Sequence, residues 1–249
     1  MIGICKLCLE KKAIQNSHII PNSYFKKLKR NGPAIQLEAT ENVPNIKSQD
    51  SWSEKLLCRK CEQHINKYEK YVIEFTNSSG FINAPKNNGK QVTFKYLNYN
   101  FFRLFQLSII FRAAVATGRE YYHIKLSEHA IDDIRKILIN EEIPNEYIYG
   151  CQMKLIVDSR TNTPLNTMVG IPIKQRIKLR EVFYFIFGGL AWEFYVPRFD
   201  RATAKSHYFI KRDGTMVMPI IDSFDYQKLM EVLPVFFLKE ELGISKLKT

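Results

Sequence analysis

Two Cys-x-x-Cys pairs, Cys5/Cys8 and Cys58/Cys61, carry the clearest chemistry in this sequence. Each pair forms a tight turn that presents two thiolates to one ion, and two such turns complete the tetrahedral four-sulfur shell that zinc prefers. Disulfides are the main alternative. The N-terminus MIGICKLCLEKK, however, lacks the pattern of a signal peptide, and a reducing compartment favours metal over cystine. We therefore predict one structural Zn²⁺, with the fifth cysteine, Cys151, as a core residue.

A histidine lies between the two cysteine pairs, in the segment Ser17-His18-Ile19-Ile20-Pro21. An imidazole titrates near neutral pH, so His18 could accept a proton from an attacking water molecule. Because four cysteines already complete a zinc shell, His18 is not needed as a zinc ligand. The alternative is a strand-end histidine that is hydrogen-bonded in the core or that braces the zinc ligands.

Two residues with side-chain oxygen atoms follow the second cysteine pair. Glu62 and Asn66 are four residues apart, about 40° round a helix, and could chelate one Mg²⁺ or Mn²⁺ ion. His64 lies about 160° from Glu62 on such a helix, so it is only an alternative to Glu62. Glu62 could also be an ordinary first-turn acid favoured by the helix dipole. Glu69 is expected to be a solvated charge, although it could reinforce an acidic pocket.

The segments CKLC (5–8), SHIIP (17–21) and KLLCRKCEQHIN (55–66) together resemble the zinc-knuckle HNH endonucleases. The resemblance covers roughly the first 75 residues, and residues 76–249 resemble no family. It implies a treble-clef, or ββα-metal, fold in which the two knuckles hold a structural zinc ion. A hairpin and a helix then form a separate site for a catalytic divalent ion. His18 matches the family's general base, which deprotonates the water that attacks the phosphodiester.

The sequence departs from the family pattern at the divalent-ion ligands. Ser17 stands where the family usually has Asp or His, and Glu62 stands where it commonly has His. The resemblance therefore implies Ser17, Glu62 and Asn66 as ligands of the catalytic Mg²⁺ or Mn²⁺ ion. The family's central Asn is not evident, because WSEKLLC offers only Ser53 and Glu54 near its expected position.

The chain is strongly basic, with a net charge of +12 and a pI near 9.4. The basic runs are spread over residues 26–30, 58–63 and 174–180, which suits a polyanionic partner such as DNA. Solubility is the alternative reason for this charge. The residues predicted to contact phosphates, unless they form only a solvated face, are Lys26, Lys27, Lys29 and Arg30.

No segment is predicted to span a membrane. The longest aromatic stretch, residues 182–192, is too short for a bilayer helix and is closed by Glu181 and Glu193. Its central Gly188-Gly189 predicts a turn between two strands. The expected location is the cytoplasm.

The predicted fold class is α+β, with a small zinc-bound treble-clef unit followed by a larger mixed domain with an antiparallel sheet and helices. The hydrophobic content of 45% is ample for a packed core. Residues 1–77 form the predicted HNH-like nuclease domain, and the polar stretch 76–90 separates it from an α+β domain at 90–249. The role of the second domain is not indicated, although it could bind a protein partner or a ligand.

Individual elements follow from local patterns. Apolar spacing predicts a helix from about Cys61, with Ile65, Tyr68, Val72 and Phe75 on one face. Other predicted helices cover about 101–117, 126–140 with Ser127 as N-cap, and 226–233. A strand is predicted at 91–97, and strands dominate from about residue 147. Asp213-Gly214 predicts a hairpin joining HYFIK to TMVMPII.

The expected function is a metal-dependent HNH-type endonuclease that hydrolyses DNA. By family association, such proteins often belong to bacterial defence systems or mobile elements. The alternative from a different class is a non-catalytic, zinc-stabilised nucleic-acid-binding module. A third interpretation is a protein-interaction adaptor in which the basic charge is incidental.

Overall fold

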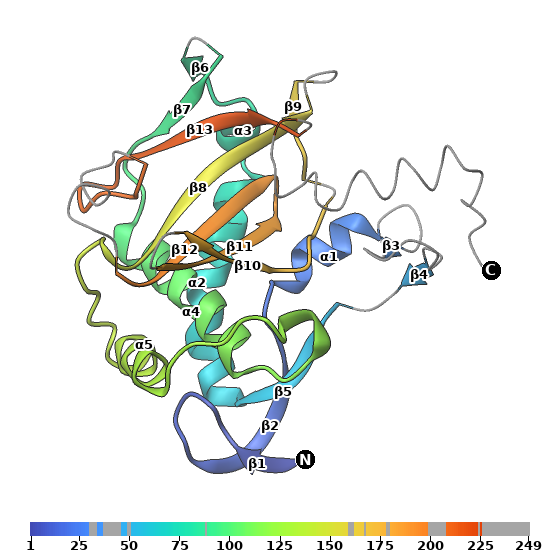
Figure 1. Cartoon of the computed structure of the whole chain (residues 1–249), viewed down its shortest axis with the longest axis vertical. Coiled ribbons are helices and arrows are strands. Elements are labelled where there is room, and N and C mark those ends of the chain that lie inside the picture. The colour runs from blue at the N-terminus through green and yellow to red at the C-terminus, as the bar shows by residue number, and fades with distance from the viewer. Residues whose placement is uncertain are drawn as a thin grey trace.

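The computed structural model describes residues 1–29, 34–36, 46–48, 51–87, 89–158, 162–166, 168–177, 180–198, 208–223 and 225 (Figure 1). The first elements are β1 (Ile2–Ile4), β2 (Lys11–His18), α1 (Asn22–Leu28), β3 (Ala34–Gln36), β4 (Ile46–Ser48), β5 (Ser53–Cys58), α2 (Arg59–Asn77) and α3 (Ser79–Ile82). The later elements are β6 (Lys86–Asn87), β7 (Gln91–Phe94), α4 (Tyr99–Val115), the 3₁₀ helix η1 (Arg119–Tyr121), α5 (Glu128–Asn140), β8 (Ile148–Asp158), β9 (Thr163–Pro164), β10 (Ile173–Ile177), β11 (Arg180–Phe187), β12 (Leu190–Arg198) and β13 (Met216–Asp222).

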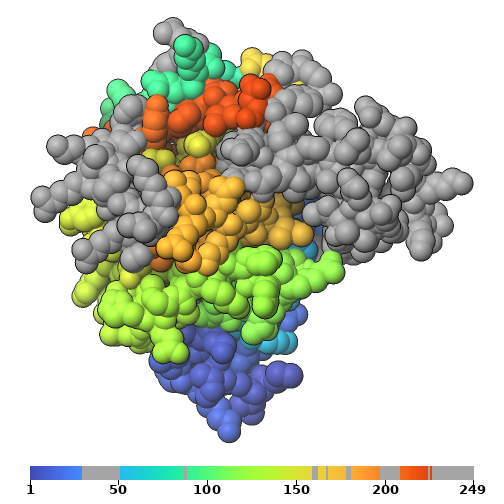
Figure 2. Space-filling view, viewed as in Figure 1, coloured from blue at the N-terminus to red at the C-terminus, as the bar shows by residue number. Residues whose placement is uncertain are grey.

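The N-terminal strands form a small antiparallel sheet in the order β1-β2-β5, and α2 follows β5 directly. The register pairs His18 with Ser53 at one end of β2 and Ile14 with Cys58 further back along it. In α2 the buried residues recur every three or four positions, as the sequence predicts: Cys61, Ile65, Tyr68, Val72 and Thr76. This sheet lies at one end of the molecule (Figures 1 and 2).

The larger sheet has the order β10-β11-β12-β8-β13-β7-β6, with β9 paired to β8. Its neighbouring strands are antiparallel except for β13 and β8, which run parallel. The predicted α+β class with an antiparallel sheet is therefore confirmed, with one parallel pair added. Chain reversal between β11 and β12 occurs at Gly188-Gly189, as predicted, and both glycines have positive φ angles of 65° and 76°.

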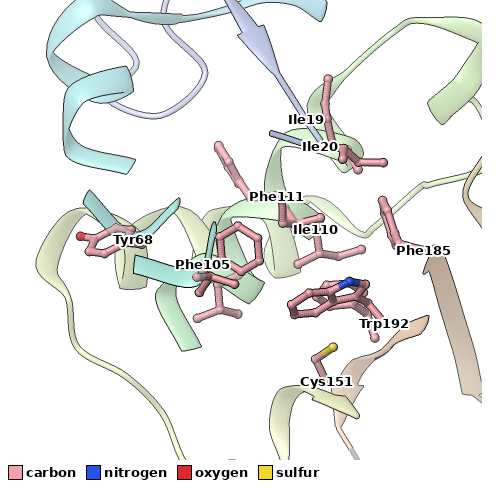
Figure 3. Close-up of a cluster of buried hydrophobic side chains, with 14 of the residues drawn as sticks. Ile19, Ile20, Tyr68, Phe105, Ile110, Phe111, Cys151, Phe185 and Trp192 are labelled. Atoms are coloured by element: carbon pink, nitrogen blue, oxygen red, sulfur yellow. The ribbon is translucent and has the colours of Figure 1, made fainter. Parts of the chain in front are cut away.

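Helix α4 lies at the centre of the molecule. It is buried continuously from Phe102 to Ala114, because its residues are apolar on nearly every face. Phe105 packs against Trp192 of the larger sheet with ring centroids 5.5 Å apart. Figure 3 shows Ile19 and Ile20, which follow β2, in the same buried cluster as Ile110 and Trp192. One hydrophobic core thus contains residues from both predicted domains. Whether residues 1–77 and 90–249 fold independently of one another stays a prediction.

Two of the helix predictions are matched closely. Helix α4 begins at Tyr99, two residues before the predicted start, because the side chain of Asn98 caps it by accepting a hydrogen bond from the Phe101 amide. Helix α5 has Ser127 as its N-cap, with the Ser127 hydroxyl accepting from the Ala130 amide. The helix predicted at 226–233 lies outside the described residues.

The predicted hairpin around Asp213-Gly214 is wrong. The turn itself forms, because the Lys211 amide donates to the Thr215 carbonyl and Gly214 has a φ of 77°. The segment 208–211 before it is not a strand, however, and β13 pairs instead with β7 and β8. The Gly214 carbonyl accepts a hydrogen bond from the Leu97 amide, so the turn contacts the segment between β7 and α4. Long-range strand pairing has overridden the local turn signal.

Within the described part of the chain, no helix is both long enough and apolar enough to cross a lipid bilayer.

Candidate metal centre and adjoining polar site

The four cysteines of the two knuckles converge on one point. The sulfur atoms of Cys5, Cys8, Cys58 and Cys61 all lie within 4.8 Å of one another, and Cys8 Sγ and Cys58 Sγ are 3.9 Å apart. A tetrahedral zinc site with Zn–S bonds of about 2.3 Å places its sulfur atoms about 3.8 Å apart. The spacing and the all-sulfur donor set therefore fit a metal ion such as zinc.

Local backbone geometry holds the sulfur atoms in place. The first knuckle is the turn between β1 and β2, in which the Leu9 amide donates to the Cys5 carbonyl and Leu9 has a φ of 61°. In the second knuckle, Cys58 is the N-cap of α2 and Cys61 lies in its first turn. The Cys58 amide donates to Cys5 Sγ at 3.3 Å, which links the two knuckles. Cys58 and Cys61 therefore both lie at the positive, N-terminal end of the α2 dipole.

All the cysteines are free of disulfide bonds. Burial, followed by the hydrogen bond with Cys58, raises the pKa of Cys61, so metal binding at this site must be accompanied by proton release. Cys151 lies on β8, where burial raises the pKa of its thiol, and it takes no part in the cluster. Its predicted role as a core residue is confirmed.

A second polar site adjoins the metal centre where β2 ends beside the first turn of α2. The Ser17 hydroxyl donates to Glu62 Oε1 and accepts a hydrogen bond from the Leu57 amide at 3.1 Å. Ser17 is fully buried and Glu62 is partly buried. Burial raises the pKa of Glu62, while the hydrogen bond from Ser17 and the charge of Arg112 oppose that rise. The fold thus brings two of the three suggested divalent-ion ligands into contact.

His18 is the last residue of β2, next to this pair in sequence. Its Nε2 atom lies 2.9 Å from the hydroxyl of Ser51, which orients the ring. Ser51 precedes Trp52, whose backbone is left-handed with a φ of 48° and whose ring packs edge-on against Phe25, with centroids 5.3 Å apart. The sequence gives no signal for the Ser51 contact, because it depends on the register between β2 and the chain entering β5.

The other suggested ligands on α2 lie apart from Ser17. Asn66 is exposed, one turn beyond Glu62. His64 is directed at α5, where its Nε2 atom lies 2.7 Å from the Leu138 carbonyl and 3.0 Å from the Tyr68 hydroxyl. The geometry therefore gives no support to His64 as a divalent-ion ligand in place of Glu62. The angle of about 160° between the two residues on a helix predicts this result.

Glu69 differs from its expected character as a solvated charge. Its side chain is 15% exposed and forms an ion pair with Arg112 Nη2 at 2.5 Å, while Arg112 itself is 1% exposed. Sequence reasoning missed Arg112. A signal was present, because an arginine inside a helix that is apolar all round must find a charged or carbonyl partner when the helix is buried.

Few metal-ligand atoms lie around Glu62. Among the described residues, the four cysteines are the only cluster of three or more His, Cys, Asp or Glu ligand atoms close enough to share an ion. Mg²⁺ usually keeps several waters and takes one or two carboxylates together with substrate phosphates. The Glu62 carboxylate and the Ser17 hydroxyl fit only a site of this kind, in which water and substrate supply most of the ligands.

The suggested phosphate-contacting residues lie on and just after α1, which begins four residues after His18. Lys26 is exposed, and burial lowers the pKa of its partly buried neighbour Lys27. Lys29 is the C-cap of α1, with its Nζ atom 5.8 Å from the centre of the Phe25 ring. Arg30 lies outside the described residues.

Comparison of the chain with family models, with curated proteins and with solved structures gives no match. The cysteine cluster and the polar site around Ser17, His18 and Glu62 are therefore the features on which a functional proposal rests.

Proposed function

We propose that this protein is a metal-dependent endonuclease of the HNH type that hydrolyses phosphodiester bonds in DNA. The contact between Ser17 and Glu62, one residue from His18, carries this proposal. It joins Ser17, which precedes His18 at the end of β2, to Glu62 in the first turn of α2. The first knuckle, β2, β5 and α2 follow one another in the order expected of a treble-clef unit, with α1, β3 and β4 inserted between β2 and β5.

His18 acts in this proposal as the general base. The hydrogen bond to Ser51 restrains its imidazole ring, and the ring accepts the proton of the attacking water. His18 is partly exposed, so a DNA phosphate can approach it from solvent.

Glu62 and Ser17 would hold the divalent ion, and Asn66 could approach it from one turn further along α2. Oxygen donors of this kind suit Mg²⁺ or Mn²⁺. A bound ion would neutralise the scissile phosphate and stabilise the leaving oxygen. The cysteine-bound zinc is structural and takes no part in the reaction.

The test is plasmid cleavage with Mg²⁺ or Mn²⁺, by wild type and by Glu62→Gln. The substitution keeps an acceptor for the Ser17 hydroxyl and removes the carboxylate charge. We expect divalent-dependent nicking or linearisation by wild type and a fall of about 10²-fold or more for Glu62→Gln, because a catalytic ion contributes several kcal/mol to transition-state stabilisation. Cleavage that persists in EDTA, or full activity of Glu62→Gln, would contradict this assignment.

The lysines of α1 are proposed to contact DNA phosphates next to His18. The double substitution Lys26→Gln/Lys27→Gln is expected to make the slope of log K against log[salt] less negative by about 1.8, at about 0.9 per phosphate contact. The measurement is fluorescence anisotropy with a labelled duplex over a range of KCl concentrations.

The matched control is Lys70→Gln/Lys136→Gln, which removes the same charge from exposed positions on α2 and α5. An equal change of slope in both double variants would mean that only net charge matters, and α1 would lose its assigned role.

The second candidate is a zinc-stabilised nucleic-acid-binding module without catalysis. The ion pair between Arg112 and Glu69 favours it, since a buried guanidinium already supplies positive charge close to Glu62. This candidate predicts salt-sensitive DNA binding with the substrate left intact in both Mg²⁺ and Mn²⁺.

A further inference from the structure

We propose that Arg112 on α4 is a positioning residue for His18, so that a helix outside the predicted nuclease unit completes the active site. This inference rests on the proposed function, in which His18 is the base. It assigns a catalytic contribution to the part of the chain for which the sequence indicates no role.

The guanidinium of Arg112 is fixed on several sides. Its Nη1 atom donates to the carbonyl oxygen of His18 at 2.5 Å, and Nη2 lies 2.5 Å from Glu69 Oε1. The Nε atom donates to the Ser108 carbonyl at 3.1 Å, and Nη2 also donates to the Ser108 hydroxyl at 3.3 Å. With 1% of its side chain exposed, this group does not serve as a surface charge.

The carbonyl that Arg112 binds belongs to the proposed base itself. Strand β2 ends at His18, so the peptide that follows is not held by further strand pairing with β5. A charged donor on this carbonyl restrains the backbone at the Cα atom from which the imidazole projects. General-base catalysis requires that the ring remain within hydrogen-bonding distance of the reacting water.

Three elements meet at this guanidinium. It joins the end of β2 through His18, α2 through Glu69, and α4 through its own backbone. Ile19 and Ile20 pack into the same core cluster as Ile110, which precedes Arg112 by two residues on α4 (Figure 3). Residues 1–77 alone would lack both the guanidinium and this packing surface.

Arg103 provides a matched control on the same helix. It is also 1% exposed, and its guanidinium likewise donates to backbone carbonyls, those of Ile148 and Tyr149. The two arginines hold different segments, since Arg112 holds the end of β2 and Arg103 holds the start of β8. Arg112 also pairs with the carboxylate of Glu69, whereas Arg103 donates to the amide oxygen of Gln106.

The experiment compares Arg112→Lys with Arg103→Lys in the full-length, zinc-loaded protein. Hydrogen–deuterium exchange reports on residues 17–21 and 148–150, and steady-state cleavage of a DNA duplex gives kcat and KM. For Arg112→Lys we expect faster exchange at 17–21, a fall in kcat of about 10²-fold from misplacement of the base, and a KM within about twofold of wild type. For Arg103→Lys we expect faster exchange at 148–150, with kcat retained.

Exchange needs no activity, so it separates this inference from the proposed function. Absence of cleavage by wild type defeats the nuclease proposal, whereas unchanged exchange at 17–21 in Arg112→Lys defeats the positioning role. Equal losses of kcat in both variants would also overturn it, because they would indicate general destabilisation.

If Arg112→Lys does not fold, Glu69→Gln removes the charge partner of Arg112 instead. In that variant we expect faster exchange at 17–21 and about a tenfold lower kcat, and wild-type values for both would overturn the inference.

Discussion

Substitution of Cys58 by serine, or removal of zinc by a chelator, is expected to unfold the sheet β1-β2-β5 and the start of α2. The sulfur atoms of the two knuckles lie within 4.8 Å of one another, and the Cys58 amide donates a hydrogen bond to Cys5 Sγ. Structural zinc supplies about 10–16 kcal/mol of apparent binding free energy in small zinc domains, and that free energy is also folding free energy. This is the largest single effect that we predict.

The measurement combines zinc content by elemental analysis with thermal unfolding followed by circular dichroism. Wild type should carry one zinc ion per chain and lose its cooperative transition, or shift it strongly downward, after chelation. Cys151→Ala is the control, because Cys151 is buried on β8 and apart from the cluster, so this variant should retain the zinc. Full zinc content in Cys58→Ser, or an unchanged transition after chelation, would contradict the metal centre.

Replacement of His18 by alanine is expected to lower the cleavage rate by about 10²–10⁴-fold, which is the usual contribution of a positioned general base. Zinc content and fold should be retained, since His18 is only partly buried and apart from the cysteine cluster. Single-turnover cleavage of a labelled duplex measures the effect on the chemical step.

His64→Ala is the matched control for His18→Ala. The His64 ring bonds the Leu138 carbonyl on α5, so its loss should cost about 1 kcal/mol of stability without slowing cleavage. If both histidine variants lose activity equally, the effect is one of folding, and His18 is not the base.

Features with local signals could be predicted from the sequence. The four-cysteine cluster follows from knuckle spacing, because each Cys-x-x-Cys turn determines where its own two sulfur atoms lie. Helix α5 follows from the cap at Ser127 and its apolar face, and the Gly188-Gly189 turn follows from glycine chemistry between two apolar runs.

Features that depend on distant pairing could not be predicted. The contact of His18 with Ser51 depends on how the chain re-enters the small sheet, and β13 pairs with β7 and β8 against its local hairpin signal. From the sequence of α2 alone, Glu69 is expected to be a solvated acid. Only the packing of α4 against α2 brings Arg112 to it. The surroundings of the candidate base are thus determined largely by residues far from it in sequence.

The most direct test of the central proposal is plasmid cleavage in Mn²⁺ by wild type, His18→Ala and His64→Ala at matched zinc content. The nuclease proposal predicts nicked or linear product from wild type and His64→Ala, and intact supercoiled plasmid with His18→Ala. Intact plasmid with all three proteins, together with tight and salt-sensitive DNA binding, would contradict catalysis and favour the binding module. Equal cleavage by all three would exclude His18 as the base.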